Sequence, residues 1–254
     1  MRFIGKVALV VGAANGIAAE TARIISSEGG IVAGFDRDEA GLQALTAELR
    51  GGRAGKALAV TGDAMDEAAA QRTVEDVVRH FGRIDILVNA VGGSGIVDDP
   101  NATIERLSLQ EWNRLVNFNL LPPYLFTRAV VPVMKINGGG KIVNVSSHAA
   151  SGRNIRNSAY ATAKAGVGGF TRKLARELGP AGINCNEVMP GRTRSHEQAE
   201  CEALADPEGT SAYLQTIPLR RLGTPQDPAR VICFLASSDA DYVTGVCIEV
   251  NGGQ

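Results

Sequence analysis

The sequence predicts one α/β domain over residues 1–254, a doubly wound parallel sheet of about seven strands with helices on both faces. Short aliphatic runs alternate with helical patterns along the whole chain, and this order is typical of βαβ units. Hydrophobic residues make up 44% of the chain and aromatic residues only 5%. A core of small aliphatic side chains suits helices that pack on a parallel sheet.

Strands are predicted where short aliphatic runs lie between turn residues, and helices where apolar residues recur every three to four positions. The predicted strands are Val7–Val11, Ile31–Phe35, Ala57–Val60, Ile84–Val88, Lys141–Val145, Ile183–Val188 and Val246–Val250. The predicted helices are Ile17–Ser27, Glu39–Leu49, Glu67–Phe81, Leu109–Met134, Tyr160–Leu178 and Gln226–Ala236. The alternation implies right-handed crossovers and a sheet covered on both faces.

One segment, at about 191–218, interrupts this alternation. It is too long for an ordinary connection between a strand and a helix. We therefore expect a substrate-loop insertion that folds partly as a helix over the substrate.

Composition narrows the function classes. The formal net charge of -1 indicates neither nucleic-acid binding nor attraction to a membrane surface, and no apolar run approaches the ~18 residues that cross a bilayer. The four cysteines form no Cys-x-x-Cys pair and the three histidines show no metal-ligand spacing. With no signal-peptide layout at the N-terminus, we expect a cytoplasmic protein with reduced thiols and no metal site.

A glycine-rich turn follows the first predicted strand. It reads Gly12-Ala13-Ala14-Asn15-Gly16-Ile17 and leads directly into a predicted helix, whose N-terminus offers N–H donors to a pyrophosphate. The second predicted strand ends at Asp36, where a carboxylate can accept hydrogen bonds from a ribose and repel a 2′-phosphate. The glycine-rich turn and Asp36 together predict a dinucleotide site that prefers NAD over NADP, although the neighbouring Arg37 could pair with that 2′-phosphate.

Tyr160 and Lys164 lie four residues apart on one predicted helix, so both side chains project from the same face. An ammonium group beside a phenol favours the phenolate and should lower the pKa of Tyr160. Such a phenol can serve as a general acid or base. Ser147 lies 13 residues before Tyr160, at the carboxyl edge of a predicted strand where ligands bind in open α/β sheets.

These motifs together resemble the short-chain dehydrogenase/reductase family along nearly the whole chain. The matching residues are Gly12…Gly16-Ile17, Asp36, Asp63, Asn89-Ala90-Val91-Gly92, Asn119, Ser147, Tyr160-x-x-x-Lys164, Pro190-Gly191 and Thr244-Gly245. The resemblance implies a Rossmann-like fold and an NAD(H)-dependent oxidoreductase that interconverts a secondary alcohol and a ketone. It also implies a homotetramer with a small-molecule alcohol or ketone as its substrate.

The resemblance implies roles for individual residues. Asn119, Ser147, Tyr160 and Lys164 are the expected catalytic residues, and Lys164 should also hold the nicotinamide ribose. The expected cofactor residues are Gly12, Asn15, Gly16, Ile17, Asp36, Arg37, Asp63, Ala64, Asn89, Ala90, Gly92, Tyr160, Lys164, Pro190, Gly191, Thr193 and Ser195. The segment Gly92-Gly93-Ser94-Gly95 is expected to be a flexible pocket wall.

Two prolines follow Asn119. Proline has no N–H to give residue i−4, so Pro123 should leave the main-chain carbonyl of Asn119 without its helical partner. By resemblance, that carbonyl holds a water molecule linked to Lys164. We expect a kink here; the alternative is that Pro122-Pro123 ends one helix and starts another.

Basic residues occur in the two segments that flank the expected substrate pocket. They are His148, Arg153, Arg156, Arg192 and Arg194. Arginine binds carboxylate, sulfonate or phosphate groups in a bidentate manner, so an anionic substrate is one interpretation. The alternative is that these arginines are solvated or lie in subunit contacts.

Two other functions stay open. One is an NADP-dependent 3-oxoacyl carrier-protein reductase, against which stand Asp36 and the uncharged Gly138 and Ala181, where resemblance leads us to expect basic residues for carrier docking. The other is a non-catalytic nucleotide-sensing scaffold, which the presence of all four expected catalytic residues disfavours.

Overall fold

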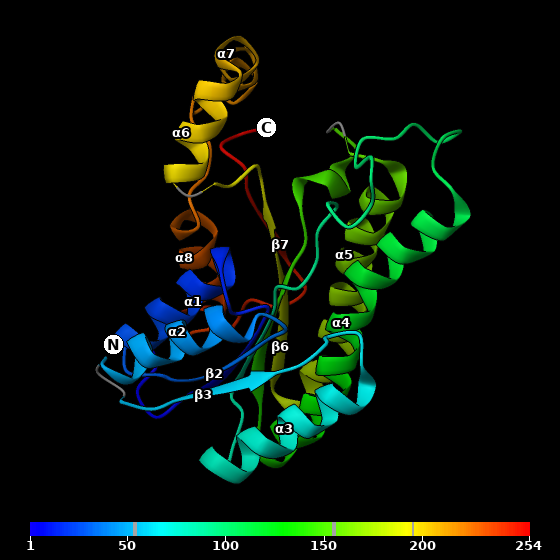
Figure 1. Ribbon diagram of the computed structural model, residues 1–254. Helices are drawn as coiled ribbons and strands as arrows, with labels where there is room; N and C mark the ends of the chain where they lie inside the picture. Colours follow the sequence, from blue (N-terminus) through cyan, green and yellow to red (C-terminus); the bar gives the residue numbers. More distant parts are fainter. Residues whose placement is uncertain (53–54, 154–155, 195) are drawn as a thin grey trace.

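Seven parallel strands form one sheet in the order β3-β2-β1-β4-β5-β6-β7 (Figure 1). The strands are β1 Val7–Val11, β2 Ile31–Asp36, β3 Ala57–Thr61, β4 Ile86–Asn89, β5 Gly140–Val145, β6 Ile183–Pro190 and β7 Cys247–Val250. The computed structural model describes residues 1–52, 55–153, 156–194 and 196–254. The strand order reverses beside β1, which pairs with both β2 and β4. The predicted fold class is therefore confirmed.

Helices cover both faces of the sheet. They are α1 Gly16–Ser27, α2 Glu39–Arg50, α3 Glu67–Phe81, α4 Leu109–Ile136, α5 Ser158–Leu178, α6 His196–Ala205, α7 Pro207–Thr216 and α8 Gln226–Leu235. One core joins α1, α2 and α8 to the sheet and includes Ile25, Leu45 and Ile232. The other joins α3, α4 and α5 and includes Val74 and Phe126. None of the described helices has an apolar stretch long enough to cross a membrane.

The predicted elements all occur, with shifts of up to two residues at their ends. Local capping explains several of these ends: Asp38 and Asp66 accept main-chain N–H groups at the starts of α2 and α3. Ser108 and Glu111 form a reciprocal capping box at the start of α4.

The double proline does not divide a helix. Helix α4 runs without interruption from Leu109 to Ile136, with Pro122 and Pro123 buried inside it. The alternative that these prolines separate two helices is therefore wrong. Because Pro123 has no N–H, the carbonyl of Asn119 still lacks its usual helical donor.

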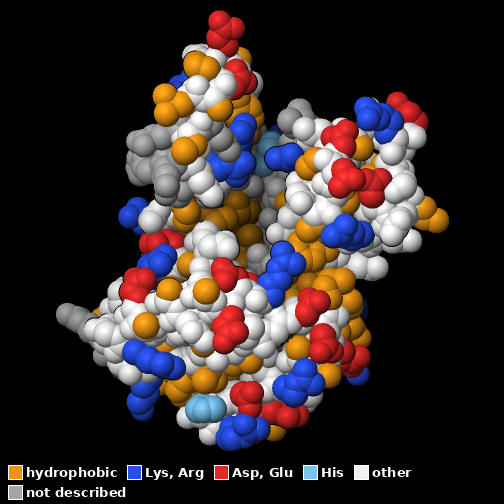
Figure 2. All heavy atoms as spheres, viewed as in Figure 1, with side chains coloured by type: hydrophobic (Ala, Val, Ile, Leu, Met, Phe, Trp, Pro, Cys, Tyr) orange, Lys and Arg blue, Asp and Glu red, His pale blue; other side chains and the backbone are white. Residues whose placement is uncertain are grey.

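The insertion at 191–218 contains two helices, α6 and α7, as the sequence predicted in part. Figure 1 shows both helices projecting beyond the sheet. Figure 2 shows a hollow between the end of the molecule that carries α6 and α7 and the opposite lobe. The insertion thus forms one wall of an open cleft, instead of closing over it.

Candidate active site

The site lies at the carboxyl edge of the sheet. Chain segments leaving β1, β4, β5 and β6 meet there, beside the point where the strand order reverses. Ser147 follows β5, Tyr160 and Lys164 belong to α5, and Asn119 belongs to α4. The fold therefore assembles four side chains that come from three separate parts of the chain.

Ser147 lies at the N-cap of a short 3-10 helix, His148–Ser151, and its Oγ accepts the N–H of Ala149 at 3.2 Å. The same hydroxyl is hydrogen-bonded to Tyr160. Ser147 thus caps this short helix and also contacts Tyr160, the expected general acid. The neighbouring Ser146 is buried and donates to the carbonyl of Val188, so it does not share this position.

The start of α5 is fixed by Asn157. Its side chain accepts the N–H of Tyr160 at 3.0 Å and donates to the carbonyl of Pro100 at 3.1 Å. Its own N–H donates to the same carbonyl at 3.0 Å. Asn157 is buried, so these bonds hold the first turn of α5, and with it Tyr160, against the loop that contains Pro100.

The pKa of Tyr160 is raised, opposite to the expected direction. Burial disfavours the phenolate and is the main cause, while the hydrogen bond with Ser147 and the positive charge of Arg156 act in the other direction. Lys164 is too distant to reverse this, since its Nζ lies 5.9 Å from the centroid of the Tyr160 ring. Tyr160 is therefore a neutral phenol at pH 7, which is the form that donates a proton.

Lys164 is almost completely buried, with 4% of its surface exposed. Its Nζ donates to the carbonyl of Val145 at the end of β5, at 3.2 Å. Burial lowers the pKa of Lys164 to about 8, and the negative charge of Glu187 acts against this. An ammonium group whose pKa is this close to neutrality can lose or gain its proton during a reaction.

Asn119 is fully buried and its side chain is fully engaged. Its Oδ1 accepts the N–H of Gly93 at 2.9 Å, and its Nδ2 donates to the carbonyls of Gly93 at 3.0 Å and Leu115 at 2.9 Å. The two hydrogen bonds between Asn119 and Gly93 fix the loop after β4. Gly93, in the segment expected to form a flexible pocket wall, is therefore tied to α4 by Asn119.

Gly92 lies against the side chains of Asn119 and Lys164. Its φ is +150°, and a Cβ added there would lie 2.5 Å from Asn119 Oδ1 and 2.6 Å from Lys164 Nζ. Only glycine fits such a close approach. The sequence analysis missed this contact; the tandem glycines directly after a strand were the signal that could have indicated it.

A cavity of about 670 Å³ adjoins the glycine turn. Gly12 has a φ of +88°, and an added Cβ would lie 3.1 Å from Val91 Cγ2. Helix α1 begins at Gly16, and the side chain of Asn15 makes no capping bond within the described chain. The cavity thus adjoins the N-terminus of α1 and a turn in which Gly12 and Gly16 have no side chains, which fits the pyrophosphate of a dinucleotide.

Asp36 is held beside this turn. One of its carboxylate oxygens accepts the N–H of Ala14 and the other that of Asp38, both at 3.0 Å. Arg37 is exposed. The structure thus places the expected ribose-binding carboxylate next to the glycine turn.

The other residues expected to contact adenosine, Asp63, Ala64 and Asn89, differ in their exposure and in their hydrogen bonds. Asp63 is exposed and caps its own turn through the N–H of Met65, and Ala64 is buried. The side chain of Asn89 points into the interior, where it donates to Asn144 at 2.8 Å and to Thr127 at 3.3 Å. Because its side chain is used in this way, only the main chain of Asn89 can meet a cofactor.

The end of β6 leads into both the cavity and the insertion. Pro190 ends the strand, and Gly191 lies so close to Asn251 that an added Cβ would be 2.8 Å from its Cα. Thr193 pairs with Gly223 in an isolated parallel bridge and lines the cavity beside the glycine turn. Ser195 lies outside the described residues.

The five basic residues do not converge on one point. Arg156 donates to Asn101 at 3.1 Å on the α5 side of the cleft, whereas Arg192 stacks on the Tyr213 ring of α7 at 4.9 Å. Arg153 is exposed. Arg194 lines the cavity beside the glycine turn.

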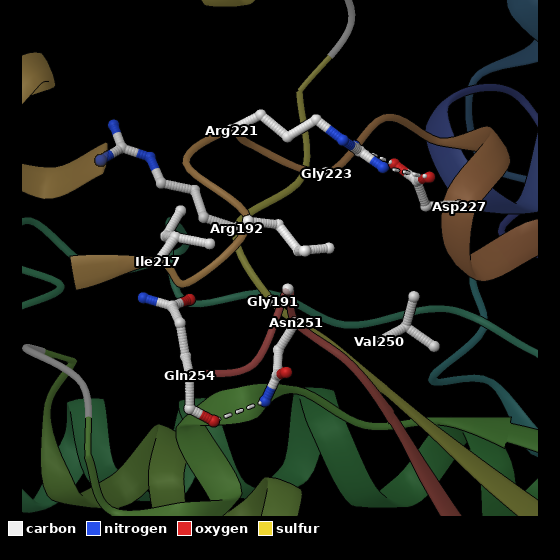
Figure 3. A pocket seen from close by; sticks show the side chains of 11 residues that line it. Gly191, Arg192, Ile217, Arg221, Gly223, Asp227, Val250, Asn251 and Gln254 are labelled. Carbon is white, nitrogen blue, oxygen red and sulfur yellow. Dashed lines mark hydrogen bonds and ion pairs between the residues drawn. The ribbon is translucent and has the colours of Figure 1, made fainter. Parts of the chain in front are cut away.

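His148 faces the C-terminal segment. It is buried, which lowers its pKa, and its Nδ1 lies 3.3 Å from Asn251 Nδ2. Asn251 also donates to the carbonyl of Gln254 at 2.9 Å beside a smaller pocket of about 180 Å³ (Figure 3). In this view Arg221 extends away toward Asp227, to which it is bonded at 2.7 Å.

Comparison with known proteins shows similarity along the full chain. A family model described as "Enoyl-(Acyl carrier protein) reductase" matches residues 12–254. The 3-oxoacyl-[acyl-carrier-protein] reductase FabG of Vibrio harveyi is 38% identical over 254 residues, covering 100% of this chain and 99% of that protein. The FabG of Escherichia coli K12 is 36% identical over 254 residues, with the same coverage.

Solved structures give the same result. Levodione reductase superposes with a TM-score of 0.90 at 31% identity, covering 100% of this chain and 98% of that one. A short-chain type dehydrogenase/reductase from Mycobacterium ulcerans superposes with a TM-score of 0.91 at 28% identity, covering 100% and 90%.

Proposed function

The chain belongs to the short-chain dehydrogenase/reductase family, and we propose that it reduces the ketone of a 3-oxoacyl group with NADH. The observation that carries this proposal is the hydrogen-bonded pair of Ser147 and Tyr160 at the carboxyl edge of the sheet, one helical turn from the buried Lys164. The curated relatives are named for 3-oxoacyl carrier-protein reduction. Their names favour this substrate over the small alcohol that the sequence analysis ranked first.

The reduced nicotinamide, when bound, supplies the hydride. Ser147 and Tyr160 both direct hydroxyl groups to the place where the substrate oxygen would lie, and together they orient the ketone. Tyr160, which burial keeps protonated, donates a proton to that oxygen as its negative charge develops. The state of Tyr160 therefore supports reduction as the direction of reaction.

Other residues would hold the cofactor. The glycine turn and the start of α1 are proposed to bind the pyrophosphate, and Arg194 to pair with it from the opposite wall of the cavity. Asp36 is proposed to accept hydrogen bonds from the adenosine ribose, which supports NADH over NADPH because a 2′-phosphate would meet a carboxylate. Lys164 is proposed to hold the nicotinamide ribose.

A free ketone or secondary alcohol is the second candidate substrate. The similarity to a protein named levodione reductase supports it, because that name refers to no carrier-bound group. Helices α6 and α7, which form one wall of the cleft, are the elements proposed to select between the two classes.

A substrate panel tests the proposal. Oxidation of NADH and of NADPH would be followed with acetoacetyl-carrier protein, acetoacetyl-CoA and cyclohexanone. We expect the highest kcat/KM with a thioester and NADH. A highest value with cyclohexanone supports the free ketone instead. Failure of all three substrates, with NADH binding intact, would favour the non-catalytic scaffold.

We also propose that the protein is a cytoplasmic homotetramer, following the family resemblance. Analytical ultracentrifugation checks the assembly against a chain mass of 26.6 kDa. A monomeric species that is fully active would contradict it.

A further inference from the structure

A buried carboxylate, Glu187, lies in β6 with only 2% of its surface exposed. One of its oxygens, Oε1, has no hydrogen-bond partner among the described residues. An ionised carboxylate in such surroundings is costly unless a positive charge or several donors compensate it. A buried carboxylate is therefore expected to have a positively charged group nearby that its negative charge stabilises.

The other oxygen of Glu187 points at α5. A Cβ added to Gly168 would lie 2.8 Å from Glu187 Oε2, so the missing side chain at Gly168 makes room for the carboxylate. Lys164 precedes Gly168 by four residues, and both are buried on the same face of α5. Glu187 thus faces α5 one helical turn from the position of Lys164 in the helix, near enough for its negative charge to raise the pKa of the Lys164 ammonium.

We propose that Glu187 is a positioning residue that keeps Lys164 in its charged form within the active site. Lys164 donates to the carbonyl of Val145 and lies against the Gly92 loop. A neutral amine would be a weaker donor in that position. The catalytic importance of this effect rests on the proposed function, whereas the effect on Lys164 itself does not.

The other groups around the pair do not take over this role. Burial, followed by the negative charge of Glu187, raises the pKa of Cys185 on β6 and of Cys247 on β7 to about 12, so both thiols are uncharged. Helix α4 presents the uncharged amide of Asn119. The charged or titratable neighbours on α5 are Tyr160, a neutral phenol, and Arg172. Arg172 Nη1 lies 3.2 Å from the same position of a Cβ added to Gly168, so Arg172 also faces Glu187, but it is exposed and water screens its charge.

The pH dependence follows from these charges. Burial lowers the pKa of Lys164 to about 8, and Glu187 opposes that lowering. Without Glu187 the pKa of Lys164 should fall further, so the ammonium would be lost at a lower pH. Any step that needs the ammonium should then fail earlier as the pH rises.

The direct test is a titration of Lys164 in protein labelled with ¹³C at lysine Cε, without cofactor or substrate. The Lys164 signal is assigned by its absence in Lys164→Arg. In Glu187→Gln we expect its midpoint to fall by about one pH unit or more. Glu187→Asp, which retains the charge, should stay near the wild-type midpoint, and the exposed Glu177→Gln on the same helix should not change it.

An unchanged midpoint in Glu187→Gln would overturn the proposal. Glu187→Leu, which is neutral and apolar, gives the same readout if the glutamine variant does not fold. The pH profile of kcat/KM then separates the two proposals. A shifted Lys164 midpoint with an unmoved alkaline limb supports the assignment of Glu187 and contradicts the catalytic role of Lys164.

Discussion

The proposed cofactor side and the proposed substrate side of the cleft are built differently. The cofactor side is made of main chain: the glycine turn, the start of α1 and the Gly92 loop, with Asp36 tied to two N–H groups. The substrate side is made of long side chains and an insertion. Arg156 is hydrogen-bonded to Asn101 in a loop, and Arg192 stacks on the Tyr213 ring of α7. Main-chain geometry fixes the reaction, while side chains on loops are free to set the substrate.

The largest effect on this comparison should come from Gly92→Ala. The added methyl group would collide with Asn119 and Lys164 and would take a φ that alanine avoids. We expect a loss of about 1–3 kcal/mol in the free energy of unfolding and a marked fall in NADH affinity. Denaturant unfolding and fluorescence titration measure both.

Gly93→Ala is the matched control, because an added Cβ there meets no atom within 4 Å. If the two variants lose equal stability and affinity, close packing at Gly92 is not what shapes the cofactor side.

A smaller effect is expected from Asp36→Asn. Removing the negative charge should raise the ratio of kcat/KM for NADPH to that for NADH by about tenfold, or ~1.4 kcal/mol. Asp38→Asn removes a charge two residues away but retains a capping side chain, so it should leave the ratio unchanged. An unaltered ratio in Asp36→Asn would mean that another group selects the cofactor.

The smallest effect should come from the substrate side. If Arg156 or Arg192 binds an anion, replacing either with Gln should lower kcat/KM for an anionic ketone by about three- to tenfold relative to a matched neutral ketone. Equal losses for both ketones, or none, would favour the alternative that these arginines are solvated or lie in subunit contacts.

The same contrast explains what the sequence could predict. The strands, the helices and the glycine turn depend on local patterns, so the sequence indicated them. The pairing of Ser147 with Tyr160 came from the family resemblance. The pair of hydrogen bonds between Asn119 and Gly93 depends on which loops the fold brings together, and no local pattern encodes that contact.

One site prediction and one alternative failed for physical reasons. The pKa of Tyr160 is raised because burial outweighs a lysine 5.9 Å away. The prolines do not break α4 because its buried face holds them in place.

The central claim is that Tyr160 donates the proton during hydride transfer. The most direct test is single-turnover oxidation of bound NADH by the 3-oxoacyl substrate in wild type and Tyr160→Phe, with the NADH dissociation constant measured on the same samples. The account predicts that NADH binds both proteins equally while the transfer rate in Tyr160→Phe falls by about 10²–10⁴. A transfer rate that survives this substitution would contradict it.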